Sequence, residues 1–102
     1  MSTVRHQFKI TAVVGRYPSE RASWYLVEIT GTVAKEIYQN FGKKHRGFGS
    51  LPVEVTVGAT TWTTSIFRAK PTSSYLLFLK AGVRKRERIE VGDRLSVSLK
   101  IT

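Results

Sequence analysis

Apolar and polar residues alternate along several short stretches of this chain, which is the pattern of half-buried β-strands. The alternation is cleanest over residues 7–14 and 94–101, where every second side chain is apolar. Four further runs are rich in β-branched and aromatic residues, namely 24–29, 53–57, 62–67 and 74–80. The pattern therefore predicts six strands.

One stretch changes from the strand period to the helical period. Three apolar residues recur there every four positions: Val33, Ile37 and Phe41. This spacing predicts a helix over residues 32–40. Thr32 is the expected N-cap, and Gly42 is expected to end the helix.

The remaining segments are predicted to be connections. Residues 15–23, which include Pro18, are expected to form a loop, and residues 81–88 a charged connection with at most one helical turn. Six strands with short connections and one short helix predict a mainly β fold, a small closed six-stranded barrel, because closure removes exposed sheet edges. Its length allows one domain over residues 1–102.

Charge is the strongest signal in the composition. Seventeen Lys and Arg residues against seven Asp and Glu residues give a net charge of +10, divided equally between residues 1–50 and 51–102. A folded body with this charge attracts polyanions such as nucleic acid, although small domains also carry charge for solubility. No run approaches the roughly 20 apolar residues of a membrane span, and the first residues lack the apolar stretch of a signal peptide, so we expect a cytoplasmic protein.

Catalytic and metal-binding chemistry is poorly represented. The chain has no cysteine, its histidines are His6 and His45, and its one aspartate, Asp93, follows Gly92 in an expected turn. Metal-ligand spacings and a Gly-x-Ser-x-Gly motif are absent from the sequence. We therefore expect a protein that is not an enzyme and carries no cofactor.

The glycine-rich segment at 47–49 is predicted to be a turn that enters a strand. It lacks the third glycine of a dinucleotide-binding motif. Although Arg46 precedes it as in the aromatic strand of RNA-recognition motifs, Ser50 stands where an aromatic residue is needed. Pro52 is also poorly suited to a central strand.

Basic residues are interleaved with aromatic ones in the second half of the chain. The basic set is Arg46, Arg68, Lys70, Lys80, Arg84, Lys85, Arg86 and Arg88, and the aromatic set is Phe48, Trp62, Phe67 and Tyr75. Stacking on bases while neutralising phosphates needs this mixture. In the alternative interpretation, Trp62 and Phe67 belong to the core and the basic residues form a solvated rim.

The chain resembles the domain-of-unknown-function 1905 family. The resemblance rests on Gly47-Phe48-Gly49-Ser50, on Val53-x-Val55-x-Val57-Gly58, on Trp62-x-Thr64-Ser65-Ile66-Phe67, and on Tyr75, Leu77, Lys80, Arg84 and Gly92-Asp93. Two positions depart from the family pattern, since Thr30 and Phe78 stand where it usually has proline.

The resemblance implies a double-split β-barrel in a bacterial cytoplasmic protein, related to the barrels of AbrB-like regulators and MazE-like antitoxins. It implies no established activity. It also places Ser65, Lys80 and Arg84 at matching positions, where a hydroxyl and two cations would hold a phosphate or a carboxylate. Each of the three also has a purely structural alternative. Ser65 could hydrogen-bond to a backbone group at a strand end, and Lys80 and Arg84 could form ion pairs with Glu54 or Glu90.

Two functions remain open from the sequence. The first is a non-catalytic binding domain whose basic face takes nucleic acid or another polyanion, which includes an acidic protein partner. The second is a protein, or an enzyme, that binds an anionic metabolite near Ser65, Lys80 and Arg84, with Trp62 and Arg46 as further candidates.

Overall fold

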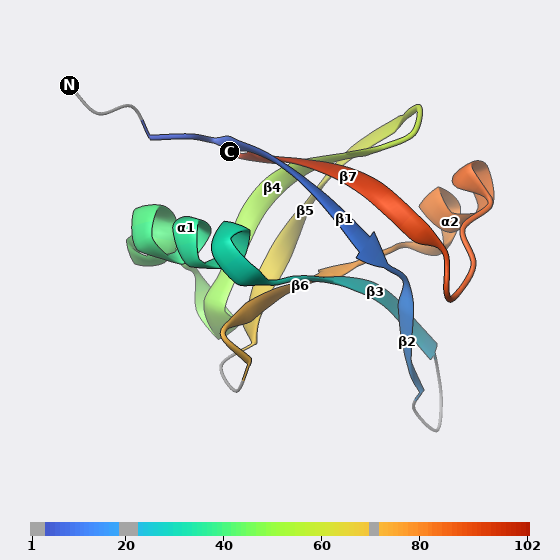
Figure 1. Cartoon of the computed structure of the whole chain (residues 1–102), viewed down its shortest axis with the longest axis horizontal. Helices are drawn as coiled ribbons and strands as arrows, with labels where there is room; N and C mark the ends of the chain where they lie inside the picture. Colours follow the sequence, from blue (N-terminus) through green and yellow to red (C-terminus); the bar gives the residue numbers. More distant parts are fainter. Residues whose placement is uncertain (1–3, 19–22, 70–71) are drawn as a thin grey trace.

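Seven antiparallel strands form one curled sheet in the computed structural model, which describes residues 4–18, 23–69 and 72–102. Their spatial order is β1-β7-β4-β5-β6-β3-β2. The strands are β1 (Gln7–Val13), β2 (Gly15–Pro18), β3 (Ser23–Ile29), β4 (Ser50–Val57), β5 (Thr60–Ala69), β6 (Ser74–Phe78) and β7 (Arg94–Ile101). The helices α1 (Gly31–Phe41) and α2 (Ala81–Glu87) lie at opposite ends of this half-barrel (Figure 1).

The predicted closed six-stranded barrel with one helix needs correction. Residues expected to be loop form β2, which pairs with β3 through Tyr17 and Trp24. The described chain thus holds seven strands in a half-barrel, and closure into a six-stranded barrel is not confirmed. The second helix, α2, spans seven residues, about two turns rather than one. The expectation failed because Pro18 tolerates an edge strand, where its missing N–H is not needed.

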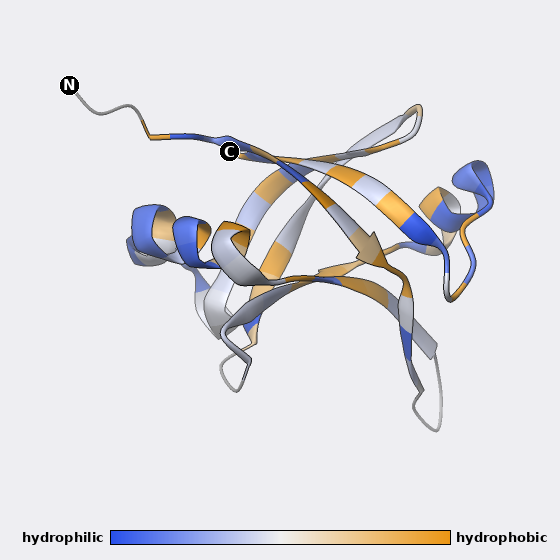
Figure 2. Cartoon of the chain, in the orientation of Figure 1, coloured by the Kyte–Doolittle hydropathy of each residue, from blue (hydrophilic) through white to orange (hydrophobic). Residues whose placement is uncertain are grey.

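The inner face of the sheet forms the hydrophobic core. Successive strand residues point to opposite faces, so every second apolar residue is buried there. The largest contributions from the strands are Leu51, Val53, Val55, Val27, Ile29, Ile66, Tyr75, Leu77 and Leu99. Helix α1 buries Ile37 and Phe41 of its predicted apolar stripe together with Ala34, whereas Val33, the third member of the stripe, is only partly buried. Figure 2 shows the hydrophilic residues concentrated on the two helices, outside this core.

The ends of α1 differ from the predicted caps. The N-cap is Thr30 rather than Thr32, and it makes no side-chain capping hydrogen bond. The helix spans Gly31–Phe41, one residue longer at each end than the predicted range of 32–40. Gly42 follows it as its C-cap but keeps a right-handed conformation (φ −58°) and leads into two short 3₁₀ segments, η1 (Gly42–Lys44) and η2 (Gly47–Gly49).

Pro52 lies in β4, a central strand, against the expectation from its chemistry. Its carbonyl oxygen accepts a hydrogen bond from the N–H of Thr102 (3.3 Å), so its nitrogen also faces β7. The β4–β7 ladder begins only at the pair Val53 and Ile101. The missing N–H of Pro52 therefore falls at the end of that ladder, opposite Thr102, where it costs one terminal bond and leaves the rest of the ladder intact.

Strands β5 and β6 pair over a short distance and then diverge. Their ladder joins Phe67 to Leu76 and ends at Ala69 and Ser74. Beyond Leu76, β6 continues beside β3, while β5 continues beside β4. This split in the sheet creates the cleft described below.

Gly58 in the β4–β5 turn provides a test of this arrangement. It has a positive φ (+58°), and a Cβ there would contact the carboxylate of Glu87, which accepts a hydrogen bond from Thr60 Oγ1 (2.6 Å). We expect Gly58→Ala to lower the free energy of unfolding by about 1–2 kcal/mol, because alanine is strained in the left-handed region.

Gly82 is the matched control, to be compared with Gly58 in urea unfolding. It lies in α2, and a Cβ there would meet no atom within 4 Å. Gly82→Ala should leave stability unchanged or raise it by up to about 1 kcal/mol. An equal decrease in the free energy of unfolding for Gly58→Ala and Gly82→Ala would contradict the positive φ at Gly58.

Candidate functional site

An apolar cleft lies on the outer face of the sheet, over β2, β3, β5 and β6. Its volume is about 600 Å³. The residues that line it are Tyr17, Trp24, Leu26, Thr64, Phe67, Leu76, Phe78 and Lys80. Since most large apolar residues of a small protein are buried, this concentration of them on an outer face marks a candidate site.

Strand register brings these residues together. Trp24 and Leu26 alternate with the inward-facing residues of β3, and Leu76 and Phe78 do the same on β6. The ladders then place Tyr17 beside Trp24, Leu26 beside Phe78, and Phe67 beside Leu76. Thus four strands contribute one apolar surface, although β2 and β3 lie far from β5 and β6 in the sequence.

The aromatic rings of the cleft hold one another in place. Phe78 packs edge-to-face against Trp24 and against Phe67, with ring centroids 5.9 Å apart in both pairs. Trp24 and Tyr17 nevertheless remain 53% and 67% exposed. Fixed and exposed rings offer a ligand flat surfaces at a small cost in conformational entropy.

One end of the cleft is polar. Thr64 and Lys80 lie beyond the last paired residues of β5 and β6, where the two strands diverge. Lys80 is the one charged group among the lining residues that the structure describes, and these include no carboxylate or imidazole. The arrangement can enclose an apolar body and attract an anionic group.

The structure brings only Lys80, of the five candidates from the sequence, to this cleft. Ser65 follows Thr64 but pairs with Pro52 of β4. Arg84 stacks on the ring of Tyr25 (3.8 Å from Cζ to the centroid) and donates a hydrogen bond from Nε to the carbonyl oxygen of Leu79 (3.2 Å).

The other two candidates also lie elsewhere. Trp62 packs against the core, and its Nε1 is buried without a hydrogen-bond partner among the described residues. Arg46 is exposed and forms an isolated bridge with Ser50. Lys70, which belonged to the basic set, lies outside the described residues.

Sequence reasoning missed most of the cleft. Its unrecognised members are Tyr17, Trp24, Leu26, Leu76 and Phe78. A signal was present in the run from Tyr75 to Leu79, where every residue is apolar, because a strand that is apolar on both faces is typically covered on both. Phe78 was noticed only as a departure from the family pattern.

A basic and aromatic cluster lies at the α1 end of the sheet. The Arg68 guanidinium stands 4.1 Å from the centroid of the Tyr38 ring and 5.3 Å from that of Tyr75. The Tyr75 hydroxyl and His45 Nε2 are 2.8 Å apart. Burial, and then the charge of Arg68, lowers the pKa of His45. Burial raises the pKa of Tyr75, and Arg68 opposes that rise.

The described residues hold neither a metal-binding cluster nor a membrane-spanning helix. They contain no group of three or more His, Asp or Glu side chains that could hold a metal ion. None of the helices there is long and apolar enough to cross a membrane.

The fold and cleft define a small β-protein with a curled seven-stranded sheet and an apolar outer surface. The chain belongs to the family described as "Domain of unknown function (DUF1905)", whose sequence model matches residues 10–99. The resemblance found in the sequence is thereby confirmed, while kinship with AbrB-like and MazE-like barrels stays a prediction. No curated protein matches the chain.

The lowered pKa of His45 predicts a pH dependence of stability. In the unfolded chain His45 binds a proton near its ordinary pKa of 6.5, whereas burial and Arg68 disfavour that proton in the folded state. Its contribution is therefore present above about pH 6.5 and is lost as the pH falls below that value toward the lower folded pKa. His45→Gln should flatten this part of the stability curve, measured by urea unfolding.

NMR titration of the imidazole provides the direct check. His45 should titrate below 6.5 in the folded protein, and Arg68→Met should raise its pKa only in part, because burial remains. A His45 pKa at or above 6.5 would show that this local environment is wrong.

Proposed function

We propose that this chain is a non-catalytic binding domain whose outer-face cleft takes an apolar or aromatic molecule that carries an anionic group. The observation that carries the proposal is the cleft itself, with about 600 Å³ of volume, fixed aromatic walls and a cation at one end. Small-molecule sites have volumes of roughly 300–1,000 Å³ and combine apolar walls with few polar groups. The sequence suggested an anionic metabolite held by Ser65, Lys80 and Arg84. In the present proposal Lys80 still contacts the anionic group, but most of the ligand's contacts are with apolar side chains.

Magnitudes separate the roles of the two parts of the site. Removing 100 Å² of apolar surface from water contributes about 2.5 kcal/mol. An ion pair with an exposed cation contributes only about 0.2–1 kcal/mol, and Lys80 is exposed. The aromatic walls should therefore supply most of the affinity, and Lys80 should orient the ligand.

Binding of single-stranded nucleic acid is the second candidate. It is favoured by the exposed rings of Trp24 and Tyr17, on which bases could stack, and by the net charge of +10. It ranks second because Leu26 and Leu76 make much of the cleft aliphatic and because the described lining holds one cation. A strand of nucleic acid needs several cations along its backbone.

Anilinonaphthalene sulfonate, an aromatic anion whose emission rises in apolar sites, tests the first proposal. We expect one saturable site on the folded protein. Trp24→Ala should weaken binding by about fivefold or more, because it removes a wall of the cleft. Lys80→Gln should weaken it by only about twofold to fivefold, as expected for an exposed cation.

Lys85→Gln is the matched control, because it removes the same charge from an exposed residue of α2 that does not line the cleft. Near-ultraviolet circular dichroism should confirm that each variant stays folded. Equal weakening by Lys80→Gln and Lys85→Gln would indicate diffuse attraction and contradict the cleft as the site.

A single-stranded oligonucleotide, titrated at two salt concentrations, tests the second candidate. Binding through the phosphates should weaken with a log–log slope of about −0.7 for each phosphate neutralised, and Trp24→Ala should weaken it further. An oligonucleotide affinity that changes neither with salt concentration nor in Trp24→Ala would contradict nucleic-acid binding at this cleft.

A further inference from the structure

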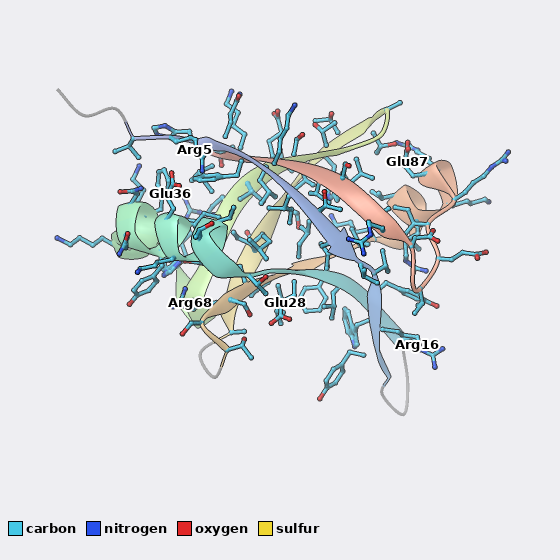
Figure 3. The ribbon with its side chains drawn as sticks, viewed as in Figure 1. Arg5, Arg16, Glu28, Glu36, Arg68 and Glu87 are labelled. Carbon is cyan, nitrogen blue, oxygen red and sulfur yellow. The ribbon has the colours of Figure 1, made fainter. Side chains whose placement is uncertain are left out.

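A second concave site lies between α1 and the sheet end that carries Arg68, Thr72 and Ser73, away from the apolar cleft. Its volume is about 570 Å³. It is lined on the helix side by Lys35, Tyr38 and Gln39 and on the sheet side by Arg68, Thr72 and Ser73, with Gly31 at its edge. Figure 3 shows Arg68 beside α1 at this end of the sheet. We refer to this site as the α1 groove.

Where β5 and β6 pair, the α1 groove and the apolar cleft lie on opposite faces of β5. Phe67 lines the cleft and Arg68 lines the groove, and consecutive residues of a strand point to opposite faces. Thr64, on the same face as Arg68, lines the cleft beyond the point where β5 and β6 diverge. The two sites share no lining residue among those described. A ligand in the groove is therefore independent of the function proposed for the cleft.

Lys35 and Arg68 are the charged residues of the described groove lining, and both are positive. Glu28 is connected to the groove wall through Ser74, whose Oγ donates a hydrogen bond to the Glu28 carboxylate (2.6 Å) and lies 2.6 Å from Thr72 Oγ1. Gln39 and the hydroxyls of Tyr38 and Ser73 add neutral polar groups. The groove thus presents two cations without a carboxylate in its described wall.

Arg68 lacks a counter-charge within the described chain. The ion pair found there joins Arg5 to Glu36, and Arg68 instead stacks on Tyr38 and Tyr75. Its Nη1 is buried and has no hydrogen-bond partner among the residues that the structure describes. Leaving an N–H of a half-buried guanidinium without a hydrogen-bond acceptor costs free energy, and a bound ion is one way in which native proteins satisfy such a group.

We infer that the α1 groove binds a phosphate group, held between Arg68 and Lys35. A phosphate monoester carries close to two negative charges at neutral pH, which matches two cations better than a single carboxylate does. The two aromatic rings hold the guanidinium plane in place, so that its N–H donors are oriented before the ligand arrives. Lys35, which is exposed on α1, adds a mobile point charge.

Inorganic phosphate and a short single-stranded oligonucleotide are the two probes, titrated at constant ionic strength while backbone amides are followed by NMR. We expect saturable shifts at Lys35, Thr72 and Ser73. Saturation by free phosphate assigns a small phosphorylated ligand, and saturation by the oligonucleotide alone assigns a nucleic-acid phosphate. No saturable shift with either probe overturns the inference.

Charge-removing variants provide the second arm. Arg68→Met should weaken binding by about tenfold, the effect of losing one charged hydrogen bond. Lys35→Met should weaken it by about twofold to fivefold, because Lys35 is an exposed cation. Lys9→Met removes the same charge from exposed β1, outside the groove, and should leave binding unchanged. Equal weakening by Lys9→Met would overturn the site in favour of general charge attraction.

Folding and the cleft are controlled separately. Lys35 is exposed, so Lys35→Met keeps the test decisive if Arg68→Met fails to fold. Trp24→Ala, which disrupts the cleft, should leave the phosphate-dependent shifts intact. Failure of the proposed function and failure of this inference are thus distinguished by different variants.

Discussion

The bend at Val14 is the constraint on which the rest of the structure depends. Val14 joins β1 to β2 and is almost fully buried. Two backbone hydrogen bonds fix it to the segment before β7: its N–H donates to the carbonyl oxygen of Asp93 (2.8 Å), and its carbonyl oxygen accepts from the N–H of Gly92 (2.9 Å). The strands on either side of it pair at the two opposite edges of the sheet. Because one continuous segment supplies both edges, the sheet has to curl, and its concave face encloses a single core.

Curling also divides the outer surface into two unlike parts. The side over β1, β7 and β4 is polar and carries Lys9, Glu54 and Lys100 around a smaller hollow. The side over β2, β3, β5 and β6 carries the exposed aromatic cleft. An apolar patch of this kind favours association with other molecules, and a net charge of +10 favours keeping copies of the chain apart. The net charge therefore opposes self-association through the cleft, in addition to attracting anions.

Strand β5 connects the two proposed sites. Its alternation sends Phe67 to the apolar cleft and Arg68 to the α1 groove, and the same period places Ile66 in the core. The split from β6 begins at this point of the strand. Three environments thus meet within three consecutive residues, which makes this segment the part of the chain where substitutions should have the most varied effects.

Local pattern in the sequence determined the strands at 24–29 and 94–101, the apolar stripe of α1 and the family, because side-chain period and turn residues are short-range properties. It misjudged Tyr17 and Pro52, whose strand positions depend on where neighbouring strands end. For the site, it identified Lys80 but grouped it with Ser65 and Arg84, which contact other residues. The alternation of apolar and polar residues along a strand indicates which face of the sheet each residue occupies. The neighbours of that residue on the same face depend on the order of the strands in the sheet. That order pairs segments distant along the chain, and only the tertiary structure decides it.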